Sequence, residues 1–252
     1  MEAKWLLVIL LFGLTSAIAT AQTTKRESRA QKLYNQYKNK KALKIYNDIL
    51  AKNPDDLTAL WHSSLLYSRI GEKFQKVTQK KQYYLIAEKR SAKALNIDQS
   101  NSQANFARAV ALGEMARVGN LEDKLKAASD IKKYAVRALK ADSSNAGAWF
   151  VLGSWNYKIA TMNTTKEAFA NILTHIPKGA STKKAITYMR KAIDLHSSYI
   201  LYYYGLAQVY KATNQKDQAI HTCRTALKKP KKTPGDAKYK RKCRKIIHNL
   251  GS

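Results

Sequence analysis

Apolar and small residues recur every three or four positions along nearly all of the chain after residue 22, with lysines and other polar residues between them. This spacing places the apolar side chains on one face of an α-helix, whereas a β-strand would need strict alternation. Alternating β-branched runs are absent, and only ten glycines and four prolines interrupt the 252 residues. The sequence therefore predicts an all-α protein.

The helical pattern repeats. In "KKALKIYNDILAKNP" a small residue, Ala42, and an aromatic one, Tyr46, precede a turn that contains proline. Small residues return at matching positions of four later segments, namely Ala87, Ser91 and Ala94; Ala135 and Ala138; Ala185, Met189 and Ala192; Ala219, Cys223 and Ala226. They let the two helices of a hairpin cross closely. Trp149-x-x-Leu152-Gly153 matches the W-x2-L-G signature of the tetratricopeptide repeat, or TPR. We predict a right-handed α-solenoid of about five TPR-like helix hairpins.

The repeat units differ in length. They start near residues 23, 57, 100, 146 and 200, and only the first interval has the regular TPR period of about 34 residues. We expect insertions between the two helices of later units, at roughly 72–83, 117–127 and 162–181, the last with an extra amphipathic helix. A capping helix is predicted over 235–250. These elements form one superhelical domain over 22–252.

The first 21 residues have the layout of a cleaved signal peptide. Lys4 precedes an apolar run from Trp5 to Leu14, and Ala19-Thr20-Ala21 is an A-x-A cleavage site. The apolar run is shorter than the roughly 20 residues that a membrane-spanning helix needs. We expect an exported protein, periplasmic or secreted. The alternative is a chain tethered to the membrane by an uncleaved signal.

The formal net charge is +29, which favours anionic partners. Basic residues are densest between 228 and 245, where the single acidic residue is Asp236. The candidates for contact with an anionic membrane or polysaccharide are Lys228, Lys229, Lys231, Lys232, Lys240, Arg241, Lys242, Arg244 and Lys245. Near an anionic bilayer each basic residue would contribute about 1 kcal/mol. The alternative is that they form the solvated face of a capping helix.

In TPR-like arrays the first helix of each hairpin lines the concave face. The residues at its inward positions are Trp61, Leu65, Arg69, Arg108, Leu112, Phe150, Ser154, Tyr157, Lys158, Leu201, Tyr204, Gln208 and Lys211. Aromatic and aliphatic groups interleaved with cations suit a peptide, a segment of a partner protein, or a lipid with an anionic group. The alternative is that the insertions fill this face, so that these side chains become core.

Catalytic and metal-binding patterns are absent from the sequence. The five histidines show no H-E-x-x-H or paired spacing, and no serine has a G-x-S-x-G context. We therefore expect neither an enzyme nor a cofactor. Nucleic acid is disfavoured as a partner because no motif places aromatics beside glycine for base stacking. Cys223 and Cys243 could form a disulfide in an oxidising compartment if their Cα atoms lie within about 7 Å, or they could be plain core residues.

The chain also resembles a known family. The segments "NPDDLTALWHSSLLYSRIGE", "AVRALKADSSNAGAWFVLGSWNYKIATM" and "KKAITYMRKAIDLHSSYILYYYGLAQVYKATNQKDQAI", with the long insertion between the last two, are similar to the regulator of microtubule dynamics family. The resemblance implies a divergent TPR fold. Animal members are described as microtubule-associated or as mitochondria–endoplasmic reticulum tethers, and one resembles a phospholipid-binding groove. An exported chain would not meet microtubules, so binding in the groove is the implied role that fits this sequence.

Overall fold

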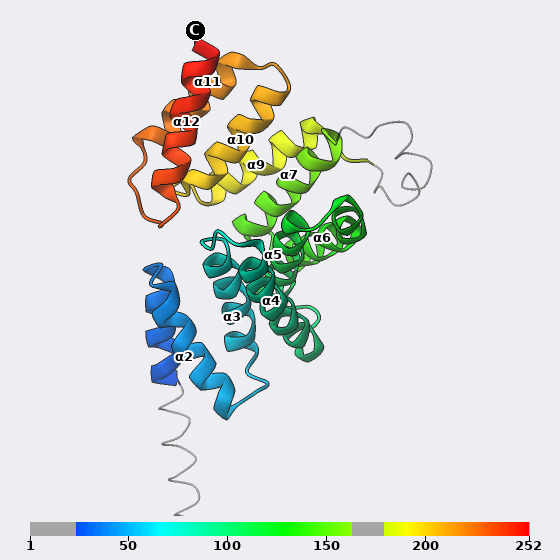
Figure 1. Ribbon diagram of the computed structural model, residues 1–252, viewed down its shortest axis with the longest axis vertical. Helices are drawn as coiled ribbons and strands as arrows, with labels where there is room; N and C mark the ends of the chain where they lie inside the picture. Colours follow the sequence, from blue (N-terminus) through cyan, green and yellow to red (C-terminus); the bar gives the residue numbers. More distant parts are fainter. Residues whose placement is uncertain (1–23, 163–178, 252) are drawn as a thin grey trace, which may run out of the picture.

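The molecule is a stack of antiparallel helix pairs. The computed structural model describes residues 24–162 and 179–251, where helices occur and no β-strand does. Residues 24–35 form the first helix. The later helices are α2 (Asn39–Lys52), α3 (Leu57–Gly71), α4 (Val77–Ile97), α5 (Ser102–Val118), α6 (Leu121–Ala141), α7 (Ala146–Ala160), α9 (Thr182–Leu195), α10 (Ile200–Ala212), α11 (Lys216–Lys228) and α12 (Asp236–Gly251). They follow one another along the long axis (Figure 1), each packed chiefly on its neighbours in the sequence. This is the predicted right-handed α-solenoid of TPR-like hairpins.

The inside of each hairpin is as predicted. All the small residues assigned above to the second helices are buried. Gly153 of α7 shows why small residues are needed, because a Cβ atom there would lie 2.7 Å from Met189 Cγ and 3.3 Å from the Ala185 carbonyl oxygen of α9. The W-x2-L-G glycine therefore sets the close approach of α7 and α9.

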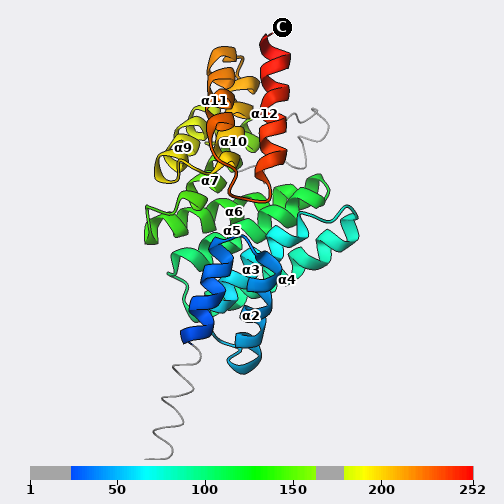
Figure 2. The same cartoon turned by 90° about the vertical axis from the view of Figure 1, so that its left-hand side faces the viewer.

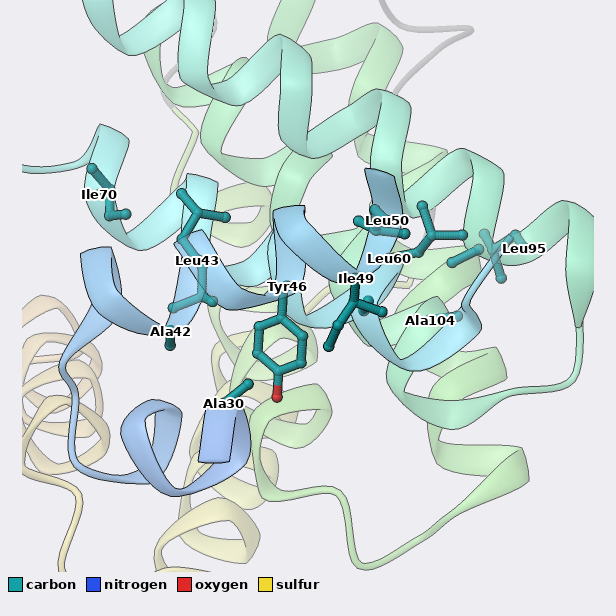
Figure 3. Close-up of a cluster of buried hydrophobic side chains, with 13 residues drawn as sticks. Ala30, Ala42, Leu43, Tyr46, Ile49, Leu50, Leu60, Ile70, Leu95 and Ala104 are labelled. Atoms are coloured by element: carbon teal, nitrogen blue, oxygen red, sulfur yellow. The ribbon is translucent and has the colours of Figure 1, made fainter. Parts of the chain in front are cut away.

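The core runs on from one repeat unit to the next. Figure 3 shows Tyr46 of α2 lying beside Ala30 of the first helix. The same cluster includes Leu60 of α3, Leu95 of α4 and Ala104 of α5. Three units thus share one continuous apolar core, as expected for a solenoid in which no single hairpin can bury its own hydrophobic face.

Most units begin with the same capping device. Asp56, Asn101 and Asn145 precede α3, α5 and α7, and each side chain accepts a hydrogen bond from the backbone N–H three residues later. Such caps satisfy an otherwise unpaired donor in the first turn. In the fifth unit, Tyr199 occupies this position before α10, and its side chain makes no cap. The fifth unit therefore departs from the repeat at its first residue.

The extra residues of units two and three lie mainly within helices. We expected insertions between the two helices at 72–83 and 117–127, but most of these residues belong to α4 and α6, which are 21 residues long each. The helices continue because these stretches contain no proline and because a helix satisfies its own backbone hydrogen bonds. Most of the third expected insertion, at 162–181, lies outside the described residues.

The two ends of the solenoid approach each other. Helix α12, the predicted capping helix, packs on α10 and α11. Its Lys238 Nζ lies 3.0 Å from Glu72 Oε1, at the end of α3 and 166 residues away. Both views place the start of α12 near the first units (Figures 1 and 2). Among the described helices none is long and apolar enough to cross a membrane.

Candidate functional site

A basic pocket of about 200 Å³ opens between α10 and α12. Its lining residues, called the α10–α12 pocket below, are Tyr204, Gln208 and Lys211 of α10 and Lys242, Lys245, Ile246 and Asn249 of α12. In the described part of the chain no carboxylate lines it. Tyr204 supplies apolar surface, Ile246 is a buried residue at the base of the pocket, and the lysines supply positive charge that the pocket itself does not neutralise.

Helical geometry explains how α12 forms its side of the pocket. Positions 242, 245, 246 and 249 are spaced three or four residues apart, so they share one face of the helix. On another face Cys243 packs into the core, which fixes the rotation of α12 against α11. Lys242 Nζ lies 5.1 Å from the centroid of the Tyr204 ring, a favourable cation–π contact.

The structure thus joins residues that we had assigned to two separate candidate sites. Tyr204, Gln208 and Lys211 were predicted for the groove, whereas Lys242 and Lys245 were predicted for the basic cluster. Ile246 and Asn249 were missed, although their spacing from Lys242 and Lys245 was a readable signal.

The other basic candidates divide into exposed and structural residues. Lys240 donates through Nζ to the Leu227 carbonyl oxygen at 2.8 Å and to that of Lys229, so it caps the end of α11. Lys229 lies over the Tyr203 ring. The exposed candidates outside the pocket are Lys228, Lys231, Lys232, Arg241 and Arg244.

The remaining groove candidates differ in accessibility. Leu65 is 3 % exposed and Leu112 is 9 % exposed, so both contribute to packing rather than to an open surface. Arg108 is bound to α4 through the Glu88 carbonyl oxygen and carboxylate. Phe150 fills the space above Gly205, where a Cβ atom would meet it at 2.6 Å. The half-buried candidates are Trp61, Arg69, Ser154, Tyr157 and Leu201, and Lys158 is exposed.

Lys158 of α7 is exposed, and desolvation by the surrounding protein lowers the pKa of its ammonium group. Glu114 opposes this shift, whereas Arg117 adds to it.

The tryptophans of α7 are structural. Trp155 is buried and donates from Nε1 to the Ala128 carbonyl oxygen at 2.7 Å. Trp149 donates to the Ser143 carbonyl oxygen at 2.9 Å and packs against Tyr188. Over residues 24–162 and 179–251, no group of three or more His, Cys, Asp or Glu residues could hold a metal ion.

Comparison with known proteins gives the family. The family model for regulator of microtubule dynamics proteins 1–3 matches residues 28–251. The chain belongs to this family. Regulator of microtubule dynamics protein 3 of Bos taurus is 22% identical over 196 residues, which are 76% of this chain and 41% of the bovine protein. The Mus musculus protein is 20% identical over the same shares. The chain therefore spans about two fifths of the curated relatives it matches.

Solved structures place this family member among TPR proteins. A thermophilic TPR protein of Thermus thermophilus matches with a TM-score of 0.63 and 14% identity, over 90% of this chain and 99% of that one. A tetratricopeptide repeat protein of Parabacteroides merdae matches with a TM-score of 0.56 and 15% identity, over 91% of this chain and 75% of that one. At these identities the likeness establishes the fold alone.

Proposed function

We propose that this member of the family is a non-catalytic scaffold whose concave face binds an acidic segment of a partner protein. The observation that carries this proposal is the α10–α12 pocket, where Lys211, Lys242 and Lys245 face one space without a lining carboxylate. Extended segments suit solenoids because a row of first helices forms a continuous concave surface. Tyr204 adds apolar contact area, and the lysines orient the acidic groups.

The proposal can be tested with a defined peptide. Fluorescence polarisation would measure binding of a fluorescein-labelled decapeptide that alternates Glu and Leu. The double variant Lys242→Glu/Lys245→Glu should bind at least about tenfold more weakly, because charge-assisted contacts are lost.

A matched control lies on the same helix. Arg241→Glu/Arg244→Glu makes the same change in net charge, but these residues are exposed outside the pocket. This control should keep most of the affinity. Equal losses in both variants would mean non-specific attraction to a basic surface, and the pocket proposal would then be abandoned.

A second candidate function is attachment to an anionic surface, because five basic candidates outside the pocket are exposed. Binding to an anionic membrane or polysaccharide would depend on all these charges. Sedimentation with phosphatidylglycerol vesicles that is lost on removing residues 228–252, and at high salt, would favour that function over peptide binding.

Export is a further part of the proposal. It is supported by the basic, apolar and A-x-A segments of the first 21 residues. Amino-terminal sequencing of the protein recovered from its native host should start near Gln22. A chain that still carries residues 1–21 would support the membrane-tethered alternative.

A further inference from the structure

Arg69, in the last turn of α3, is a half-buried cation without an acidic partner among the described residues. Its Nη2 donates to Tyr34 Oη at 2.7 Å, and the guanidinium lies 4.2 Å from the centroid of that ring. Its Nη1 is buried and has no hydrogen-bond partner among the described residues. None of the ion pairs found in residues 24–162 and 179–251 includes Arg69. Burying an unpaired charge is costly, so proteins rarely retain one without a partner or a function.

Tyrosines from two distant parts of the chain interact with this guanidinium. The ring of Tyr37 lies 5.5 Å from the guanidinium carbon, and both Tyr199 and Tyr202 of the fifth unit interact with it electrostatically. Burial raises the pKa of Tyr199 to about 12, so its hydroxyl is a hydrogen-bond donor at neutral pH. The nearest acid of α12, Asp236, is already occupied by the backbone N–H groups of Lys232 and Thr233.

Tyr37 is held in an unfavourable backbone conformation. Its φ is 55°, in the left-handed region. The N–H of Lys38 bonds to the Leu33 carbonyl oxygen and that of Tyr37 to the Tyr34 carbonyl oxygen, so Tyr37 occupies the position of a helix end where glycine is usual. Strained residues of this kind cluster at functional sites.

Tyr199 and Tyr202 both break the repeat. Where Tyr199 stands, the other units have the capping residues Asp56, Asn101 and Asn145. Three positions later, where Tyr202 stands, they have the fully buried alanines Ala59, Ala104 and Ala148. The fifth unit thus lacks both the cap and the small residue. Both replacements are tyrosines: Tyr202 packs on Phe150 and on Tyr199, and both tyrosines interact electrostatically with Arg69.

We propose that Arg69, with Tyr34, Tyr37, Tyr199 and Tyr202, forms a binding site for a single carboxylate of a peptide ligand. A guanidinium matches a carboxylate in a planar, bidentate geometry, and tyrosine hydroxyls can donate to the same oxygens. One cation with neutral donors balances one negative charge, which favours a carboxylate over a doubly charged phosphate monoester. The aromatic rings would enclose the apolar part next to the carboxylate.

Tyr239 of α12 connects the Arg69 site to the α10–α12 pocket. Tyr239 of α12 packs near Tyr204 at 5.6 Å between ring centroids, and it also interacts electrostatically with Tyr199. A bound segment could therefore reach both sites. The inference rests on the proposed function only in taking the ligand to be a peptide.

A small probe tests the site independently of any peptide. Phenylacetate carries a carboxylate and a ring, and phenylacetamide is its neutral counterpart. In a ¹H–¹⁵N spectrum, the Nε–Hε signal of Arg69, assigned by its loss in Arg69→Lys, should shift saturably with phenylacetate and not with phenylacetamide. The signal of exposed Arg137, which also lies near a tyrosine ring, is the internal control. Equal shifts with both probes, or none at Arg69, would overturn the inference.

Two variants follow the repeat pattern, so they should keep the fold. Tyr199→Asn introduces the capping residue of the other units, and Tyr37→Gly introduces the usual residue for a left-handed position. Each should weaken phenylacetate binding at least about fivefold with unchanged helical circular dichroism. If both variants bound phenylacetate as tightly as the parent protein does, Tyr199 and Tyr37 would not be part of the site.

Peptides distinguish the source of the carboxylate. The Glu–Leu decapeptide is compared with its carboxyl-terminal amide and with the version in which Gln replaces Glu. A loss on amidation that is absent in Arg69→Lys assigns Arg69 to a terminal carboxylate, and a loss with Gln that is smaller in Arg69→Lys than in the parent protein assigns it to a side chain. If Lys242→Glu/Lys245→Glu abolishes peptide binding while the phenylacetate shift persists, the Arg69 site stands apart from the pocket. A failure of Arg69→Lys to weaken the peptide would refute the Arg69 site and leave the proposed function intact.

Discussion

Gly153 and Gly113 occupy first helices of neighbouring units, yet the same substitution should affect them in opposite directions. A Cβ atom at Gly153 would meet Met189 and Ala185 of α9, whereas one at Gly113 meets nothing within 4 Å. Gly153→Ala should lower the free energy of unfolding by roughly 1–3 kcal/mol through overpacking. Gly113→Ala should raise it by roughly 0.5–1 kcal/mol, because alanine favours the helix. Urea denaturation measures both values, and a stabilising Gly153→Ala would contradict the close crossing of α7 and α9.

His62 should make the stability of the protein sensitive to acid. Its ring is buried between Tyr46 and Trp61, and desolvation lowers its pKa from 6.5 to about 3. Below about pH 6.5 the unfolded chain binds a proton at His62 that the folded protein does not, so stability falls as the pH falls toward 3. The stability lost between pH 7 and pH 4.5 should be about 2 kcal/mol smaller in His62→Phe, which keeps an aromatic ring in the stack.

Exposed His221 provides the control for this pH effect. The variant His221→Gln should lose as much stability as the parent protein over the same pH interval. If His62→Phe also matched the parent, acid sensitivity would have to arise elsewhere.

At the scale of helices, Cys223 and Cys243 connect α11 to α12. Both are free and fully buried in one core cluster, and the neighbouring Cys243 thiol raises the pKa of Cys223. Thiols this close can be joined when the protein refolds with oxidised glutathione, which takes up their two electrons and two protons. The disulfide should raise the free energy of unfolding by about 3 kcal/mol, because it restricts the unfolded chain.

Intact mass is the direct measurement for this pair. The refolded chain should be about 2 Da lighter than the reduced chain, since two protons leave. Cys223→Ala should show neither the mass change nor the added stability. A parent chain whose mass did not change after oxidative refolding would show that both residues act as core only.

The sequence was sufficient for the elements but not for the site. Ala42, Ala135 and Gly153 recur with the repeat, so local spacing predicted their burial and the hairpins that they form. The α10–α12 pocket depends on how α12 rotates and packs on α10, and no local pattern encodes that contact between elements. The solvent accessibility of side chains could not be predicted from the sequence either. Leu65 and Arg69 both occupy inward positions, but only packing decides that Leu65 is buried.

One signal was nevertheless available in the sequence. Aligning the turns "NPDD", "DQSN", "DSSN" and "HSSY" shows a tyrosine, Tyr199, in place of an acid or asparagine in the last unit. Where one residue departs from an otherwise regular repeat, we expect that function rather than folding determines that residue. Tyr202 departs in the same way three residues later.

At the scale of the whole molecule, contact between the ends distinguishes this solenoid from an open array. The Lys238–Glu72 ion pair is partly exposed, so a double-mutant cycle of Lys238→Ala and Glu72→Ala should give a coupling energy of only about 0.2–1 kcal/mol. The expected coupling is favourable and weakens in 0.5 M salt. A coupling of zero at low salt would mean that this ion pair does not stabilise the contact between α12 and α3.

The contact between Lys238 and Glu72 also bears on how the protein comes apart. Stacked repeats ordinarily fray from their outermost units, because each terminal unit has only one neighbour. Here α12 also contacts Glu72 at the end of α3, so the last helix has a partner in the second unit as well as in its own. Fraying of α12 should then be coupled to opening at the end of α3, with amide exchange slowed at both places. The slowing should be small, because the ion pair contributes at most about 1 kcal/mol.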